Sequence, residues 1–312
     1  MEKIPMRDGY GKALLKLCRE RDDVVVLDAD VSKSTRTAWI HDQFPDRFLN
    51  MGISEQDMIG TAAGLALGGM RAFASTYGVF LCGRAWDEIR TTVCYNRLNV
   101  KLGGAHAGIS VGPDGATHQA LEDIALMRVL PGMTVIAPCD AIETEKATLA
   151  AAGIEGPVFL RFGREPVPVV STEDTPFIPG KANVLRDGCD AAIFAIGAMV
   201  YEALAAAETL AGEGVDAAVI NLHTIKPIDR DCILRFAEQT GAIVTAEEHQ
   251  RFGGMGSAVA EVLVSAKPVP LEMVAVDDSF GESGQPEELM RKYGLDAEAV
   301  AAAVRKVLRR KG

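Results

Sequence analysis

The chain has 312 residues, 48% of them hydrophobic, and a formal net charge of -11 at pH 7. This length and composition allow two buried cores of about 100–170 residues each. The acidic balance argues against nucleic-acid binding, because that binding relies on Lys and Arg side chains that neutralise phosphates. An anionic small molecule would therefore have to meet a local group of cations.

Neither a leader nor a membrane segment is indicated. The N-terminus, MEKIPMRDGY, lacks the basic and apolar regions of a signal peptide, and the longest apolar run, residues 191–200, is too short to cross a bilayer. We therefore expect a cytoplasmic protein with no membrane partner. The six cysteines are scattered and form no C-x-x-C, so we interpret them as small reduced hydrophobes and not as zinc ligands or disulfides.

The first half of the chain alternates short apolar runs with amphipathic segments. Runs of strand character cover residues 24–27, 48–51, 71–74, 100–103, 134–137 and 158–161. Residues 10–18 and 79–95, which lie between them, have the apolar spacing of helices. This alternation predicts the α/β class, with a mainly parallel sheet and helices on both of its faces.

A Pro-rich segment, residues 164–180, interrupts the alternation and has no helical period. We interpret it as part of a linker, and we place a first domain at residues 1–165, the linker at 166–184 and a second domain at 185–312. The expected strands of the second domain are residues 191–196, 216–221, 242–247 and 271–276, with helices between and after them. The second domain is therefore also expected to be a mainly parallel α/β sheet.

A glycine-rich loop, residues 253–256, precedes one of these helices and invites a dinucleotide-binding interpretation. Such a site needs a G-x-G-x-x-G after the first strand of a unit and an acidic residue about 20 positions later. The loop matches neither the spacing nor the position. We therefore expect its glycines to allow close packing of loop and helix.

Glu55 opens an expected helix of small residues and directly follows Ser54. A carboxylate in a first helical turn interacts favourably with the helix dipole, and Ser54 is a suitable N-cap, so a structural role is the simpler interpretation. The aromatic residues Tyr77 and Phe80 follow the next strand. Beside a half-buried carboxylate they would form a wall that suits a flat heteroaromatic ring, although aromatics at this spacing also line ordinary helix faces.

The densest polar cluster is the glycine-rich segment 103–119, which contains His106 and His118, two of the five histidines. It follows an expected strand, and open α/β sheets bind ligands at the carboxyl ends of their strands. A zinc site is the obvious alternative. The spacing of twelve residues fits no common ligand pattern and no cysteine lies nearby, so we favour a site for an organic ligand.

Four short runs stand out for their order and spacing: residues 52–56 (GISEQ), 73–77 (FASTY), 114–123 (DGATHQALED) and 224–229 (TIKPID). The first three resemble the pyrimidine-binding domain of the transketolase family, and the fourth is similar to its C-terminal domain. Together they extend over nearly the whole chain. The resemblance implies a thiamine diphosphate-binding fold joined to a transketolase C-terminal-like domain.

By that resemblance, Glu55 would bond the pyrimidine ring nitrogen of thiamine diphosphate, while Tyr77 and Phe80 would stack on the ring or border it. The cofactor supplies the carbanion chemistry, and the protein orients and polarises it. The resemblance also places Asp30 in the cofactor cleft. A strand-end aspartate equally serves to cap a following turn.

The resemblance further implies a substrate site. It places around a sugar phosphate Arg7, Ser34, His106 and Arg164, and on the substrate hydroxyls Asp114 and His118. The planar fork of arginine suits a phosphate, and two arginines would offset the acidic surface locally. Each arginine taken alone is more simply a surface residue. With Glu55, the two histidines are the implied catalytic residues.

One motif of the family is missing from this sequence. The family's other half binds the cofactor diphosphate through Mg2+ or Ca2+ and uses a Gly-Asp-Gly, which does not occur here. We therefore expect no metal site on this chain and a partner subunit that carries the motif. Because the family's cofactor lies between domains of different protomers, we expect homodimerisation and an α2β2 assembly.

These expectations describe the C-terminal subunit of a two-subunit transketolase, which transfers a two-carbon ketol unit from a ketose to an aldose. The β subunit of a 2-oxoacid dehydrogenase shares the layout, but phosphate-facing arginines would have no role with pyruvate. A fragment of a 1-deoxyxylulose phosphate synthase is another alternative, although that enzyme is normally one longer chain. A binding module that kept the fold and lost the chemistry is the alternative from another class; the intact glutamate and histidines argue against it.

Overall fold

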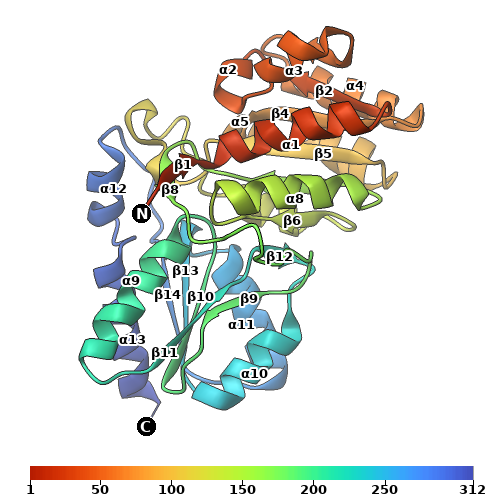
Figure 1. The fold of residues 1–312 in the computed structure, drawn as a ribbon. Helices are drawn as coiled ribbons and strands as arrows, with labels where there is room; N and C mark the ends of the chain where they lie inside the picture. Colours follow the sequence, from red (N-terminus) through yellow and green to blue (C-terminus); the bar gives the residue numbers. More distant parts are fainter. Residues whose placement is uncertain (312) are drawn as a thin grey trace.

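The computed structural model describes residues 1–311, which form two α/β units that lie one above the other in Figure 1. Each unit contains a mainly parallel sheet between layers of helices, as the alternation of apolar runs and amphipathic segments predicts. None of the helices in this range combines the length and the apolar character that crossing a bilayer requires.

The first unit is built on a seven-stranded sheet with the order β12-β6-β7-β5-β4-β2-β3. The strands from β6 to β3 are parallel, and β12 joins the edge antiparallel to β6. Their bounds are β2 (Val24–Asp28), β3 (Phe48–Asn50), β4 (Arg71–Tyr77), β5 (Val100–Ala105), β6 (Thr134–Ile136), β7 (Val158–Arg161) and β12 (Thr224–Lys226). All the strands that the sequence predicts for this half are therefore confirmed.

Alternate residues of these strands face two layers of helices, as Val24 and Val25 on β2 illustrate. Val24 belongs to the core formed with α1 and α8, whereas Val25 belongs to the core formed with α4, α5 and α7. Gly9 lets α1 approach α8, because a Cβ there would lie 2.0 Å from the carbonyl oxygen of Ala141. The helices are α1 (Met6–Glu20), α4 (Glu55–Leu67), α5 (Gly78–Arg84), α7 (Asp123–Arg128) and α8 (Ala141–Gly153), and the shorter segments are α2 (Ser32–Thr35), α3 (Ala38–Gln43), η1 (Pro45–Arg47), α6 (Trp86–Glu88), η2 (Ile89–Cys94) and η3 (Ile109–Asp114).

The second unit is built on a five-stranded sheet with the order β14-β13-β10-β11-β9, in which β9 runs antiparallel to β11 and the other pairs are parallel. Helices α9 and α13 cover one face, and α10 and α11 cover the other. The strands are β9 (Asn183–Arg186), β10 (Ala191–Ala195), β11 (Ala217–Asn221), β13 (Ile243–Gln250) and β14 (Leu271–Val276), and the helices are α9 (Met199–Gly212), α10 (Arg230–Thr240), α11 (Met255–Ala266), α12 (Pro286–Lys292) and α13 (Ala297–Arg310). The glycine loop before α11 packs closely, as expected, because a Cβ at Gly254 would lie 2.5 Å from the Glu247 carboxylate.

Two strand pairings connect segments that are distant in the sequence. Strand β12 follows β11 of the second unit and yet completes the sheet of the first. Strand β1 (Lys3–Pro5) pairs antiparallel with β8 (Pro166–Pro168), so the segment expected as a linker begins with a paired strand. The division of the chain at residues 165 and 185 stays a proposal.

The helical character expected for residues 79–95 is confirmed, but the segment is divided into α5, α6 and the π-helix η2. Ala85, between α5 and α6, has φ -110° and ψ 18°, outside the values of a regular helix. The indole N–H of Trp86 donates to the carbonyl of Leu126 at 2.9 Å. A contact with a distant segment thus orients the turn at Ala85 and Trp86. The apolar spacing of residues 79–95 does not indicate this contact.

His223 lies between β11 and β12, and 0% of the residue is exposed. Its ring centroid lies 4.3 Å from that of Phe177. Burial lowers the pKa of His223 from 6.5 to about 4, while the nearby Asp229 acts in the opposite direction. Between these two pH values the unfolded chain binds a proton that the folded chain excludes.

We predict that the stability which depends on neutral His223 is fully present above pH 6.5 and is lost as the pH falls towards 4. One such proton changes the free energy of unfolding by at most about 1.4 kcal/mol per pH unit. Urea unfolding across this range should show a smaller slope for His223→Phe, which keeps the ring packing, than for the unsubstituted chain. His41→Gln, at an exposed histidine, should leave the slope unchanged; equal slopes for His223→Phe and the unsubstituted chain would contradict the prediction.

Candidate active site

Glu55 is the first residue of α4 and is 4% exposed. Its carboxylate accepts a hydrogen bond from Nη1 of Arg84 at 3.0 Å. Ser54 occupies the expected N-cap position, but within the described chain its side chain makes no capping bond. A cavity of about 610 Å³ opens beside the carboxylate and is lined by Ile53, Ser54, Glu55, Gln56, Asp57 and Arg84.

Arg84 is a residue of this site that the sequence did not lead us to expect. Its guanidinium lies over the ring of Phe80, 4.0 Å from the centroid, while it pairs with Glu55. The two residues are four positions apart on α5, a spacing that puts their side chains on one face of a helix, and this spacing is the signal in the sequence. Arg84 therefore joins the buried carboxylate to the aromatic residues.

Tyr77 ends β4 and connects the aromatic residues to two neighbouring segments. Its ring stacks on that of His106, with centroids 4.0 Å apart, and lies 5.8 Å from that of Phe80. Its hydroxyl donates to Oγ of Ser34 at 3.0 Å. The carbonyl of Ser34 in turn accepts from Nη1 of Arg7 at 3.2 Å. These contacts bring five of the expected site residues together.

His106 is 2% exposed and has a left-handed backbone, with φ 56°. Burial, followed by the positive charges of Arg7 and Arg164, lowers the pKa of His106 to about 3. The ring is therefore neutral near pH 7. Its Nδ1 is buried and has no hydrogen-bond partner among residues 1–311, and buried polar atoms in folded proteins are normally bonded. We interpret this atom as a contact for a ligand.

Three guanidinium groups act on this histidine, those of Arg7, Arg36 and Arg164. Burial and the charge of Arg36 lower the pKa of Arg7, and Nε of Arg7 is buried without a partner in the described residues. Arg36, which was not expected from the sequence, pairs with Asp8 at 2.6 Å. We call these three arginines the cation cluster. Arg36 and Arg164 are each paired with a carboxylate, so Arg7, with its unpaired Nε, offers the most direct donor to an anion.

Three more of the expected residues, Arg164, Asp114 and His118, lie around η3. Arg164 pairs with Asp114 at 3.2 Å and donates to the carbonyl of Val111 at 3.1 Å. The ring of His118 lies 5.1 Å from that of Phe80 and 5.9 Å from that of Tyr77. His118 therefore borders the aromatic residues, and Asp114 borders the cation cluster.

Asp30 stands apart from the other expected residues. It is exposed, has φ 63° and accepts a hydrogen bond from Nδ2 of Asn50 at 2.9 Å. No hydrogen bond or ion pair in the described chain joins it to the rest of the site. The capping role weighed for a strand-end aspartate belongs to Asp28, which is buried and accepts from the backbone N–H of Val31 and the hydroxyl of Thr35, each at 2.7 Å.

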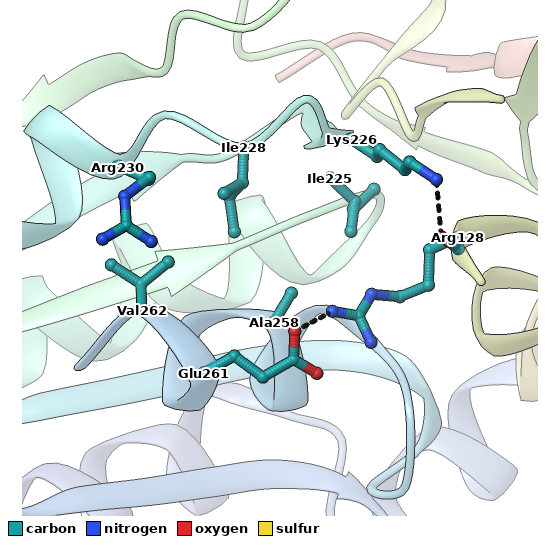
Figure 2. Close-up of a pocket in the computed structure, with 8 residues that line it drawn as sticks. All are labelled: Arg128, Ile225, Lys226, Ile228, Arg230, Ala258, Glu261 and Val262. Atoms are coloured by element: carbon teal, nitrogen blue, oxygen red, sulfur yellow. Dashed lines mark hydrogen bonds and ion pairs between the residues drawn. The ribbon is translucent and has the colours of Figure 1, made fainter. Parts of the chain in front are cut away.

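A second cavity, of about 320 Å³, lies between the two units and contains none of the expected site residues (Figure 2). Figure 2 shows Arg128 directed at Glu261, at 2.6 Å, and Lys226 directed at the carbonyl of Arg128, at 2.9 Å. Arg128 and Lys226, which line this cavity, thus hold α7 against α11 and β12. Residues 1–311 contain no group of three or more His, Cys, Asp or Glu side chains placed to bind a metal ion.

Comparison with known proteins gives matches over almost the whole chain. The family model described as "Transketolase, pyrimidine binding domain" matches residues 2–169, and "Transketolase, C-terminal domain" matches residues 180–300. A solved structure titled "Split gene transketolase, inactive beta4 tetramer" is 51% identical, with a TM-score of 0.93, and the alignment covers 99% of this chain and 100% of that one.

Two curated relatives are similar over almost their full length. The 6-deoxy-6-sulfo-D-fructose transketolase subunit SqwH of Clostridium sp. is 42% identical over 311 residues, which cover 100% of this chain and 97% of the relative. An Apulose-4-phosphate transketolase subunit of Phocaeicola vulgatus is 38% identical over 298 residues, which cover 95% of each. With its pyrimidine-binding and C-terminal domains, the chain belongs to the transketolase family.

Proposed function

We propose that the chain is the C-terminal subunit of a two-subunit, thiamine diphosphate-dependent transketolase that moves a two-carbon ketol unit from a ketose to an aldose. The observation that carries the proposal is the continuous set of contacts from Glu55 through Arg84, Phe80 and Tyr77 to His106. It sets a buried carboxylate and an aromatic surface beside the cation cluster. A flat cofactor ring next to an anionic sugar requires such neighbours.

The residues around Glu55 fit the pyrimidine end of thiamine diphosphate. The carboxylate is buried but borders an open cavity, and Phe80 and Tyr77 offer aromatic faces for stacking. When bound, the cofactor supplies carbanion chemistry that protein side chains lack. Glu55 would hold a hydrogen bond to the ring nitrogen and exchange a proton there. Arg84 would keep the carboxylate oriented before the ring arrives.

The cation cluster supports a phosphorylated sugar as substrate. Arg7 and Arg164 offer guanidinium donors to a phosphate, and Ser34 lies beside Arg7. His106 stays neutral near pH 7, so we propose that it acts as a hydrogen-bonding group and leaves the positive charge to the arginines. Asp114 and His118 would bind the substrate hydroxyls. The name of one relative, an Apulose-4-phosphate transketolase subunit, refers to a phosphorylated sugar for that protein.

A partner subunit would complete the active site. Two relatives are named as subunits, and a structural neighbour is titled as an inactive β4 tetramer of a split-gene transketolase. We propose a partner with a Gly-Asp-Gly motif that binds the diphosphate through Mg2+ or Ca2+, and an α2β2 assembly in the cytoplasm. Ile53 and Leu67, which are 73% and 74% exposed near the two ends of α4, are apolar side chains that such a contact would cover.

The β subunit of a 2-oxoacid dehydrogenase remains the nearest alternative. Its substrates carry a carboxylate but no phosphate, and the cation cluster around His106 favours the phosphorylated class. A binding module without chemistry is disfavoured, because Glu55 and the histidines lie on one connected surface. The proposed place of Asp30 in the cofactor cleft rests on the resemblance alone, because its hydrogen bond in the described chain is to Asn50.

In the enzyme assembled with its partner, Glu55→Gln should slow proton–deuterium exchange at the cofactor C2 by about 10²–10⁴-fold. Glutamine keeps the shape and accepts a hydrogen bond, but it cannot exchange a proton with the ring nitrogen. NMR of the bound cofactor measures the rate. Glu298→Gln, which removes a carboxylate from the first turn of α13, is the control and should exchange normally. An unchanged rate in Glu55→Gln would leave Glu55 with a structural role alone, at the start of α4 and in its pair with Arg84.

Arg164→Ala should weaken apparent affinity for a phosphorylated acceptor by roughly one to two orders of magnitude, because a charge-assisted hydrogen bond contributes about 1.5–3 kcal/mol. An unphosphorylated acceptor of the same length should keep its kinetic constants. Steady-state kinetics with this matched pair measures the selectivity, and Arg305→Ala, which removes a surface partner of Glu213, is the control. Equal losses on both acceptors would make Arg164 structural and would favour a 2-oxoacid substrate.

A further inference from the structure

Strand β13 carries two consecutive buried glutamates, Glu247 and Glu248, which are 1% and 6% exposed. Successive side chains of a strand point to opposite faces, so the two carboxylates serve different partners. Glu247 accepts hydrogen bonds from the backbone N–H groups of Met255 and Gly256, both at 2.8 Å, and so holds the start of α11 within its own unit. Glu248 reaches into the other unit.

The Glu248 carboxylate accepts a hydrogen bond from the backbone N–H of Ser110 at 3.0 Å, across 138 residues of sequence. Ser110 belongs to η3, in the segment between His106 and His118. Gly108 leaves the necessary space, because a Cβ at that position would lie 2.3 Å from Oε2 of Glu248. Gly108 also has φ 87°, a conformation that glycine adopts without strain.

The backbone of Glu248 is fixed to the first unit as well. Its carbonyl accepts from Nη2 of Arg161 at 2.7 Å, and Nε of Arg161 pairs with Asp123 at 2.8 Å. The neighbouring Gln250 donates its backbone N–H to the carbonyl of Leu121 at 2.8 Å. These bonds join the backbone on both sides of the Glu248 side chain to the first unit.

A second contact holds the far end of the same loop. Nε2 of Gln119 donates to the carbonyls of Ile109, at 3.1 Å, and Glu282, at 2.9 Å. Gly281 makes this approach possible, because a Cβ there would lie 1.8 Å from Oε1 of Gln119. The second unit therefore contacts this segment at Ser110, through Glu248, and again at Gln119, through the carbonyl of Glu282.

We propose that Glu248 is a positioning residue: its carboxylate holds the loop 106–118 so that His106 and His118 keep their places beside Tyr77 and Phe80. The kinetic part of this inference rests on the proposed function, whereas the structural part does not. Burial raises the pKa of the Glu248 carboxyl group, and a polar group this deeply buried is costly unless it is hydrogen-bonded. The second unit thereby shapes an active site whose side chains all come from the first.

Hydrogen–deuterium exchange of the chain alone tests the structural part. Ser110 and Glu248 both line a cavity of about 780 Å³ between the units, so water reaches this N–H once the carboxylate is gone. In Glu248→Ala, exchange of residues 106–119 should rise about tenfold or more, while β4 stays protected. Glu248→Gln should recover most of the protection, because its carbonyl oxygen still accepts. Glu247→Ala is the matched control and should raise exchange at residues 255–258 instead.

Kinetics of the assembled enzyme test the functional part. Glu248→Ala should lower kcat/KM for a phosphorylated acceptor by about ten- to a hundredfold, because the loop places the groups that meet the substrate. The affinity for thiamine diphosphate, which depends on Glu55, should stay within about twofold. Glu247→Ala should change neither constant when measured well below its unfolding temperature.

Three outcomes overturn the positioning role: unchanged exchange at residues 106–119 in Glu248→Ala, equal loosening of this segment by Glu247→Ala, or raised exchange with unaltered kinetics. An inactive assembly of the unsubstituted chain would be a failure of the proposed function alone. The exchange result would still decide whether Glu248 holds the loop.

Discussion

The arrangement of the site depends on one buried ion pair, between Arg161 at the end of β7 and Asp123 at the start of α7. The two side chains are 6% and 1% exposed, and the guanidinium also bonds the carbonyls of Ala120 and Glu248. Removing one partner of such a pair typically costs about 3–5 kcal/mol, because it leaves an uncompensated charge in the interior. This pair joins the sheet of the first unit, the segment after His118 and strand β13 of the second unit at one point.

The charges of the molecule are distributed unevenly between its surface and the site. The surface carries an excess of carboxylates, which gives the chain its net charge of -11, whereas the cation cluster gathers three arginines around one neutral histidine. A guanidinium keeps its charge at all physiological pH values, and neutral His106 offers a donor or an acceptor according to its tautomer. The site therefore presents a permanent charge for an anion and a hydrogen-bonding group that does not repel it.

The sequence predicts the regular parts of this fold well, because they depend on local patterns. The strands from β2 to β7 and from β10 to β14, apart from β12, follow from short apolar runs, and the motifs around Glu55 and His118 identify most of the site. What it misses depends on contacts between distant segments. Arg84 becomes a residue of the site because the fold brings α5 to Glu55 at the start of α4. Likewise, β12 follows a strand of the second unit in the sequence but pairs with β6 of the first. The break at Ala85 and the choice of Asp28 over Asp30 as the capping residue have the same origin.

The structure also suggests why such a chain would need a partner. Glu55 and Arg84 face an open cavity, and apolar side chains at both ends of α4 are exposed. The proposed function assigns the diphosphate–metal group to the partner subunit. The chain would thus contribute the pyrimidine contact, the aromatic surface and the substrate cations, and the partner would contribute the rest.

Calorimetric titration of thiamine diphosphate, with and without Mg2+, tests this division most directly. The chain, its proposed partner and their mixture should be titrated under the same conditions. The account predicts weak binding without metal dependence for the chain alone and tight, Mg2+-dependent binding for the mixture. Tight, Mg2+-dependent binding by the chain alone would contradict it.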